Sequence, residues 1–231
     1  MHTQEPFQPP TFSDPNLVEN PEPRCPVVLL LDTSGSMQGA PINELNQGLQ
    51  VFKDSLMADS LALKRVEVAL VTFGPVQTVQ EFITADMFVP RELRATGDTP
   101  MGSAIRHSLD LLAARKSQYK SAGLAYYRPW IFLMTDGGPT DPWQEAAQMV
   151  HRGEEGKSFM FFAVAVENAN VEILRQIAPP SRPPLKLKGL AFRELFQWLS
   201  TSLRSVSQSR VDDKVTLPDP TAGPGGWATT T

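Results

Sequence analysis

Cysteine and histidine are scarce in this 231-residue sequence, and their scarcity limits the metal chemistry that it can perform. Cys25 is the only cysteine, so the chain cannot form an internal disulfide or a zinc or iron–sulfur site built from several cysteines. The three histidines, His2, His107 and His151, lack the spacing of metal ligands, and we expect them to be ordinary surface or core-edge residues. This composition fits a reducing compartment best.

Basic charge and long apolar runs are also scarce. The formal net charge is −4 at pH 7, which argues against nucleic acid as a partner. No apolar run approaches the ~20 residues of a membrane-spanning helix. The N-terminus lacks the basic start and the apolar stretch of a signal peptide. We therefore expect a soluble, cytoplasmic protein that binds neither nucleic acid nor membrane.

Proline and glycine, in contrast, are plentiful at the two ends of the chain. Residues 1–24 are rich in proline and predict an extended arm that lies across the domain or reaches a partner. Residues 211–231, which include LPDPTAGPGGWATTT, predict a flexible C-terminal tail whose single tryptophan, Trp227, could pack on the domain. The remaining residues, 25–210, are long enough for a single domain with a sizeable core.

Between these ends, continuous apolar runs alternate with amphipathic stretches. The apolar runs predict buried strands at Pro26–Leu31, Val66–Phe73, Trp130–Thr135 and Ser158–Val166, and weaker alternation predicts a hairpin strand at Val76–Phe82. Spacings of three and four residues predict helices at Ile42–Leu56, Met101–Ala114, Pro142–His151, Val171–Ala178 and Leu190–Val206. The polar stretch Lys116–Pro129 is predicted to be a long connection. The pattern indicates a doubly wound, Rossmann-like α/β fold, with a mostly parallel sheet, one antiparallel edge strand and helices on both faces.

Polar loops at one edge of this predicted sheet carry an unusual number of short oxygen-bearing side chains. They are LDTSGSMQG after the first strand, GDTPMGSA at the start of a helix, and TDGGPTD after the strand at Trp130–Thr135. Ligands of such sheets bind at the carboxyl ends of the strands. The loops would offer five oxygen donors there, from Asp32, Ser34, Ser36, Thr99 and Asp136. An all-oxygen set with few charges suits Mg²⁺ or Mn²⁺, so the sequence predicts a metal site.

The motifs D-x-S-x-S, G-x-T-x-x-G-x-A and T-D-G, in this order, resemble the metal-ion-dependent adhesion site of von Willebrand factor A domains. The five matching positions are Asp32, Ser34, Ser36, Thr99 and Asp136. The resemblance implies that the serines and the threonine bind Mg²⁺ directly or through water and that the aspartates act mainly through water. It also implies that a Glu or Asp from a partner protein completes the metal shell.

The resemblance covers roughly residues 26–208. Within it, DTSGSMQGAPINELNQGL, YYRPWIFLMTDGGPTD and LAFRELFQWLSTSLRSVSQS are similar to the TerY group of bacterial proteins associated with tellurite resistance. That similarity implies genes beside a protein kinase and a PP2C-type phosphatase. We therefore expect a non-enzymatic, Mg²⁺-dependent adaptor in a bacterial stress response.

Two alternatives stay open at this point. One is a Mg²⁺-dependent phosphoryl-transfer enzyme with Asp32 as nucleophile, although such enzymes place a second acid where this chain has Ser34. No lysine has an obvious position for binding the phosphoryl group in such an enzyme, and Lys53 and Lys64 are the candidates that stay open. The other is a purely structural ion, with the real interface in the aromatic and basic connection Tyr119–Trp130. Dinucleotide binding and a serine nucleophile are disfavoured, because the chain has no G-x-G-x-x-G motif and no histidine placed as a base.

Overall fold

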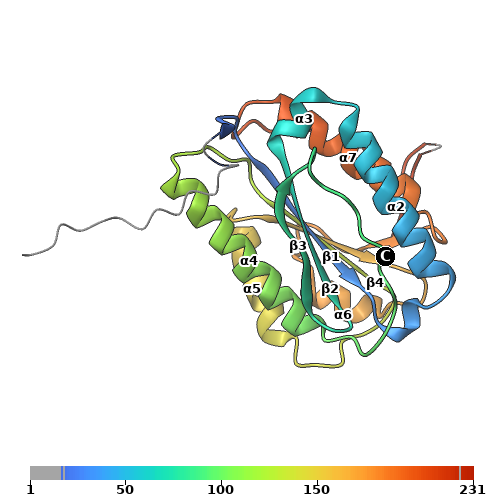
Figure 1. Cartoon of the computed structure of the whole chain (residues 1–231). Helices are drawn as coiled ribbons and strands as arrows, with labels where there is room; N and C mark the ends of the chain where they lie inside the picture. Colours follow the sequence, from blue (N-terminus) through green and yellow to red (C-terminus); the bar gives the residue numbers. More distant parts are fainter. Residues whose placement is uncertain (1–16, 18, 224) are drawn as a thin grey trace, which may run out of the picture.

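A seven-stranded sheet between two layers of helices forms the part of the chain that the computed structural model describes, residues 17, 19–223 and 225–231 (Figure 1). The strands are β1 (Cys25–Asp32), β2 (Val66–Phe73), β3 (Gln77–Thr84), β4 (Trp130–Thr135), β5 (Met160–Ala165), β6 (Leu185–Leu187) and β7 (Ala228–Thr230). The helices are η1 (Gly35–Met37), α2 (Ala40–Met57), α3 (Ser60–Arg65), α4 (Met101–Ser121), α5 (Gln144–Glu155), α6 (Val171–Ile177) and α7 (Phe192–Gln208).

The strand order, β3-β2-β1-β4-β5-β6-β7, is that of a doubly wound sheet. Strands β2, β1, β4, β5 and β6 run parallel, and β3 pairs with β2 in antiparallel register. Every residue of β1, β2 and β4 is buried, because helices cover both faces of the sheet. The predicted α/β class, parallel sheet and antiparallel edge strand are confirmed. A second antiparallel strand, β7, lies at the other edge.

The two faces of the sheet form separate hydrophobic cores. Alternate side chains of β1 point to opposite faces, so Leu29 packs in the core under α2 and α7, and Leu30 packs in the core under α4, α5 and α6. Figure 1 shows the same division, with α2, α3 and α7 on one side of the sheet and α4 and α5 on the other. The cores hold β1 rigidly in the centre of the sheet.

Helix α4 is longer than its sequence pattern predicted. It continues to Ser121 and so includes the first six residues of the predicted connection Lys116–Pro129. The prediction that the connection begins at Lys116 was wrong. Arg115 and Tyr119, four residues apart on the same helical face, both reach the buried carboxylate of Glu67 on β2. This long-range polar contact, invisible to an apolar periodicity, accounts for the extra turns.

The C-terminal segment packs on the domain where its composition predicted a flexible tail. The Trp227 side chain is buried and lies edge-on to Trp198 of α7, with ring centroids 5.7 Å apart. The three residues that follow it form β7 beside β6. One aromatic anchor and a strand pairing therefore order a segment that glycine and proline made look unstructured.

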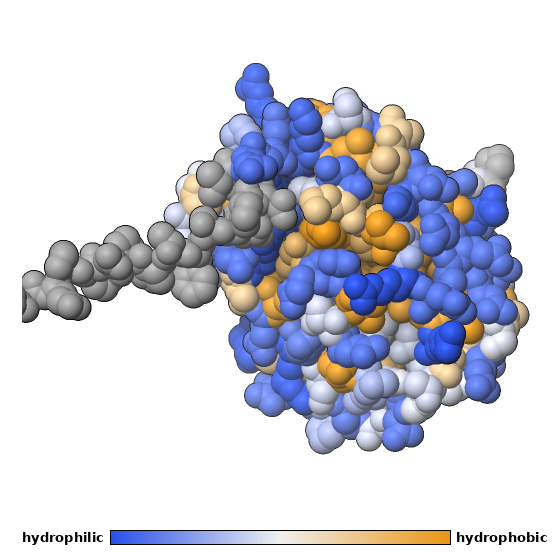
Figure 2. Space-filling model, viewed as in Figure 1, coloured by the Kyte–Doolittle hydropathy of each residue, from blue (hydrophilic) through white to orange (hydrophobic). Residues whose placement is uncertain are grey.

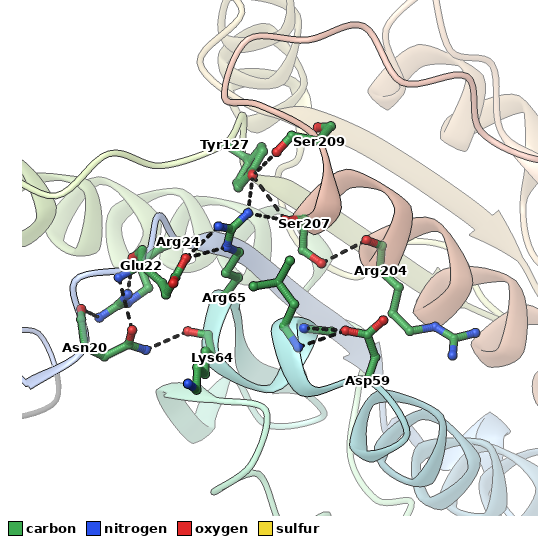
Figure 3. A network of polar contacts seen from close by, with 12 residues as sticks. Asn20, Glu22, Arg24, Asp59, Lys64, Arg65, Tyr127, Arg204, Ser207 and Ser209 are labelled. Carbon is green, nitrogen blue, oxygen red and sulfur yellow. Dashed lines mark hydrogen bonds and ion pairs between the residues drawn. The ribbon is translucent and has the colours of Figure 1, made fainter.

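The predicted N-terminal arm lies largely outside the described residues, but its last part contacts the domain. The Asn20 amide donates to the Lys64 carbonyl, and the Glu22 carboxylate binds the Arg65 guanidinium at 2.6 Å. Figure 3 shows that Arg65 also reaches Tyr127 and the end of α7 at Ser207. This network ties the chain before β1 to α3 and α7, at the end of the sheet where β1 begins.

The visible surface is mostly hydrophilic, with small separate hydrophobic patches (Figure 2). Among the described residues, the large hydrophobic side chains with substantial exposure are Met57, Met87 and Val89. No helix in the described part of the chain is both long and apolar enough to cross a membrane.

Candidate metal centre

The first polar loop leaves the central strand β1 at its carboxyl end. Asp32 is the last residue of β1 and is fully buried. The Ser34 amide donates to the Asp32 Oδ1 at 2.8 Å, which turns the chain back over the strand end. The short helix η1 follows, and the Gly35 amide donates to the Gly97 carbonyl at 3.0 Å. These bonds hold the first loop against the loop that precedes α4.

The Asp32 carboxylate is held at both oxygens. Its Oδ1 accepts from the Ser34 amide, and its Oδ2 accepts from the Thr135 hydroxyl at the end of β4, at 2.5 Å. Burial raises the pKa of Asp32, and the hydrogen bonds from Ser34 and Thr135 work in the opposite direction by favouring the ionised form. The carboxylate is therefore oriented before any ligand arrives.

Hydrogen bonds join three of the loop side chains to one another. The Ser34 and Ser36 hydroxyl oxygens lie 3.1 Å apart, and the Ser36 hydroxyl donates to the Asp136 Oδ1 at 2.6 Å. The Thr99 and Ser36 side chains both lie beside Gly137. A Cβ built on Gly137 would be 3.6 Å from the Thr99 Oγ1 and 3.9 Å from the Ser36 Oγ. The structure thus gathers the five residues that the sequence singled out, at the adjoining ends of β1 and β4.

This place in the sheet is where the strand order reverses. From β1, the next strand in the chain, β2, lies on one side, and β4 lies on the other. Loops that leave β1 and β4 therefore diverge, and the space between them is the usual ligand site of such sheets.

The residues fit a hard divalent ion. Among the described residues, no group of three or more His, Cys, Asp or Glu side chains could hold a metal, and the oxygens at these loops come from two carboxylates and three hydroxyls. In an octahedral shell with Mg–O distances of ~2.1 Å, neighbouring oxygens lie ~3.0 Å apart. The Ser34 and Ser36 oxygens lie 3.1 Å apart, close to this value, whereas the Ser36 Oγ and the Asp136 Oδ1, which share a hydrogen bond, are closer at 2.6 Å. Two carboxylates and three hydroxyls are the donor chemistry that Mg²⁺ and Mn²⁺ accept.

Thr135 is a residue of this site that sequence reasoning did not assign. It lies inside the T-D-G motif, but the strand pattern placed it in the core, where it is indeed fully buried. Besides binding Asp32, its hydroxyl accepts from the Gly137 amide at 3.2 Å. A buried threonine at the end of an apolar strand, directly before the aspartate, was the available signal.

The connection Tyr119–Trp130, the alternative interface, has most of its aromatic side chains turned into the domain. Tyr119, Tyr127 and Trp130 are buried, and the Tyr127 hydroxyl donates to the Ser209 carbonyl at 2.6 Å. The aromatic residues of this connection therefore pack against the domain instead of forming an exposed face. The described histidines are also ordinary, since His107 contacts Thr78 and His151 contacts a backbone carbonyl.

Solved structures share this fold at low sequence identity. The pilus adhesin SpaC from Lactobacillus rhamnosus GG is 14% identical with a TM-score of 0.63, and the match covers 80% of this chain and 30% of that one. The ArnB paralog VWA2 from Sulfolobus acidocaldarius is 18% identical with a TM-score of 0.52, over 79% of this chain and 45% of that one.

A third similar structure is proximal thread matrix protein 1 from the mussel byssus, described with a zinc-occupied MIDAS motif. It is 19% identical with a TM-score of 0.52, over 79% of this chain and 48% of that one. This chain thus spans less than half the length of each of these proteins. No curated protein matches it.

The family assignment follows from the sequence match. Residues 27–193, which run from β1 into α7 and contain all three polar loops, match the von Willebrand factor type A domain. The strand order and the helices on both faces agree with the fold shared by the structural neighbours. The chain belongs to the von Willebrand factor type A domain family.

Proposed function

We propose that this domain binds Mg²⁺ through Asp32, Ser34, Ser36, Thr99 and Asp136, and that the ion serves to bind another protein. The observation that carries the proposal is the gathering of oxygen-bearing side chains from the loops after β1 and β4 and from the loop before α4. When bound, the ion would supply a Lewis-acidic position that accepts a carboxylate. Mn²⁺ would fit the same donors, and the zinc-occupied MIDAS motif described for the mussel byssus protein supports a divalent ion at a site of this kind.

The partner in this proposal carries an exposed Glu or Asp. Ser36 is exposed at the edge of the group, whereas Asp32 lies beneath it, so the ion would sit between the buried aspartate and solvent. The two carboxylates of Asp32 and Asp136 would carry no more negative charge than is needed to neutralise a divalent ion. The bound ion could therefore still attract a third carboxylate, from the partner. The description of SpaC as a pilus adhesin supports a binding role for domains of this fold.

We further propose that this chain is a cytoplasmic member of the TerY group, acting in tellurite resistance or a related stress response with a protein kinase and a PP2C-type phosphatase. The proposal is supported by the resemblance of the DTSGSMQGAPINELNQGL, YYRPWIFLMTDGGPTD and LAFRELFQWLSTSLRSVSQS stretches. These lie in η1 and α2, in β4 with its following loop, and in α7. In this role the domain would assemble its partners and perform no chemistry of its own.

Phosphoryl transfer from Asp32 is the competing function, and the geometry favours the binding role over it. Asp32 is fully buried, and Ser34 stands where such enzymes place a second acid. Lys64 lies in α3 directly before β2, at the opposite end of the sheet from Asp32. Incubation with acetyl phosphate and Mg²⁺ should therefore leave the intact mass unchanged, and a phosphoryl adduct lost in Asp32→Asn would favour the enzyme.

The binding function is tested by capture of proteins from lysate of the source cell. Wild type and Asp32→Ala are each used with Mg²⁺ and with EDTA, and retained proteins are identified by mass spectrometry. Partners retained only by wild type with Mg²⁺, and released by free glutamate, would support the proposal. Equal retention in all four conditions would contradict it.

A further inference from the structure

The second and third polar loops are bound to each other by Asp141, a residue that the proposed metal site does not use. Its Oδ1 accepts from the Gly102 amide at 2.8 Å, and its Oδ2 accepts from the Ser103 amide and the Ser103 hydroxyl, both at 2.7 Å. Helix α4 starts at Met101, and Pro100, the residue before it, supplies no capping side chain. Asp141 therefore caps α4 from a different loop, 38 residues away in sequence.

Thr140, next to Asp141, joins the same loops closer to the proposed metal site. The Thr99 amide donates to the Thr140 hydroxyl at 3.1 Å, and the Thr140 amide donates to the Thr99 carbonyl at 2.9 Å. The backbone of Thr99 is thus bound on both sides to the loop that carries Asp136. Its own side chain is left free to face Gly137.

Gly102 shows how tightly the two loops meet. A Cβ at this position would lie 2.2 Å from the Pro142 carbonyl oxygen and 2.8 Å from the Trp143 Cα, closer than real side chains approach backbone atoms. Glycine is therefore required for the first turn of α4 to contact the third loop. The same contact brings the Gly102 amide within reach of Asp141.

We propose that Asp141 is a positioning residue of the metal site, which fixes Thr99 of the second loop relative to Asp136 of the third. The inference rests on the proposed Mg²⁺ binding. A small octahedral ion tolerates little variation in the separation of its donors, and Thr99 and Asp136 come from different loops. Asp141 contacts the first turn of α4 through both carboxylate oxygens, so we assign it a role in holding the two loops together and not in binding the ion.

The test is Mg²⁺ affinity, measured by isothermal titration calorimetry on the full chain well below its unfolding temperature. Asp141→Ala removes all three hydrogen bonds, and we expect a loss of affinity of about 10-fold or more, the usual effect of losing a group that orients a metal ligand. Asp141→Asn keeps one acceptor oxygen and should fall between Asp141→Ala and wild type. The losses of Mg²⁺ affinity should persist in 0.5 M NaCl. At this salt concentration the Debye length is ~4 Å, so a loss caused only by removing the negative charge of Asp141 would be screened.

Asp59 provides the matched control. Its carboxylate caps α3 by accepting from the Leu61 and Ala62 amides at 3.0 and 2.8 Å, at the opposite end of the sheet. Asp59→Asn should lower stability as Asp141→Asn does, while leaving Mg²⁺ affinity unchanged. Hydrogen exchange of the Thr99 and Gly102 amides should accelerate in Asp141→Ala and not in Asp59→Asn.

Each outcome has a distinct meaning. Wild-type affinity in both Asp141 variants would overturn the positioning role while leaving the metal site intact. Complete loss of binding in Asp141→Ala, equal to that in Asp136→Ala, would overturn it in favour of a direct ligand. An absence of saturable Mg²⁺ binding in wild type would overturn the proposed function itself and the positioning role with it. Gly102→Ala, which forces the same two loops apart, should weaken binding as Asp141→Ala does.

Discussion

Replacing Thr135 with valine should weaken metal binding without disturbing the fold around it. The substitution preserves the shape of the side chain and removes the hydroxyl that donates to the Asp32 Oδ2 at 2.5 Å and accepts from the Gly137 amide. A hydrogen bond to a charged group contributes ~1.5–3 kcal/mol to stability, so the free energy of unfolding should fall by that amount at pH 7. With one carboxylate oxygen released, Mg²⁺ affinity should fall ~10–100-fold, or about 1.4–2.7 kcal/mol.

The assay combines urea unfolding, followed by circular dichroism, with calorimetric titration of Mg²⁺. Thr72→Val is a matched control, because Thr72 is also a buried strand threonine but its hydroxyl has no hydrogen-bond partner within the described part of the chain. It should leave Mg²⁺ affinity unchanged and be neutral or stabilising. Thr135→Ser, which keeps the hydroxyl, should retain most of the affinity. Equal affinities for Thr135→Val and wild type would refute the reasoning.

Three further predictions concern Trp227 and Cys25, outside the metal site. Trp227→Ala should lower the free energy of unfolding by ~3–5 kcal/mol in urea denaturation, because the ring is buried against Trp198. It should leave Mg²⁺ affinity unchanged. A loss below ~1 kcal/mol would mean that the C-terminal segment does not pack as described. Burial raises the pKa of Cys25 to about 12, so the folded thiol should stay protonated and fail to react with a thiol reagent at pH 8 until urea unfolds the chain. Because the unfolded thiol ionises from about pH 8.5 upward and the folded one does not, Cys25 should also make stability fall as pH rises from there towards 12. Rapid labelling of native protein would contradict its burial.

Apolar periodicity was sufficient to predict most of the sheet. Strands buried on both faces read as continuous hydrophobic runs, and β4 begins and ends at the predicted residues, Trp130 and Thr135. The prediction of helices at Ile42–Leu56 and Leu190–Val206 was correct to within a few residues, because the core under α2 and α7 needs one apolar stripe on each.

The elements that were missed depend on contacts distant in sequence. Helix α3 has six residues and one buried side chain, so it shows little periodicity. Strands β6 and β7 have three residues each and form through pairing, β6 with β5 and β7, and β7 with β6, which their own short sequences do not reveal. Composition predicted a flexible tail there because it counts glycine and proline and cannot see where Trp227 packs.

In the candidate site, too, some residues could be predicted from the sequence and others could not. The five proposed ligands could be predicted because their residue types and spacing carry the chemistry. Thr135 and Asp141 could not, because each acts through a hydrogen bond to a partner at least 38 residues away in sequence. Residues that hold ligands in place are specified by the fold, and the sequence around them gives only weak signals.

The most direct test of the metal site is a calorimetric titration of Mg²⁺ into wild type, Asp136→Ala and Asp98→Ala. Asp98 is an exposed neighbour of Thr99 that is not among the proposed ligands, so its loss controls for a general change of surface charge. The account predicts one saturable Mg²⁺ site in wild type and in Asp98→Ala, and none in Asp136→Ala. Wild-type affinity in Asp136→Ala, or no binding to wild type, would contradict it.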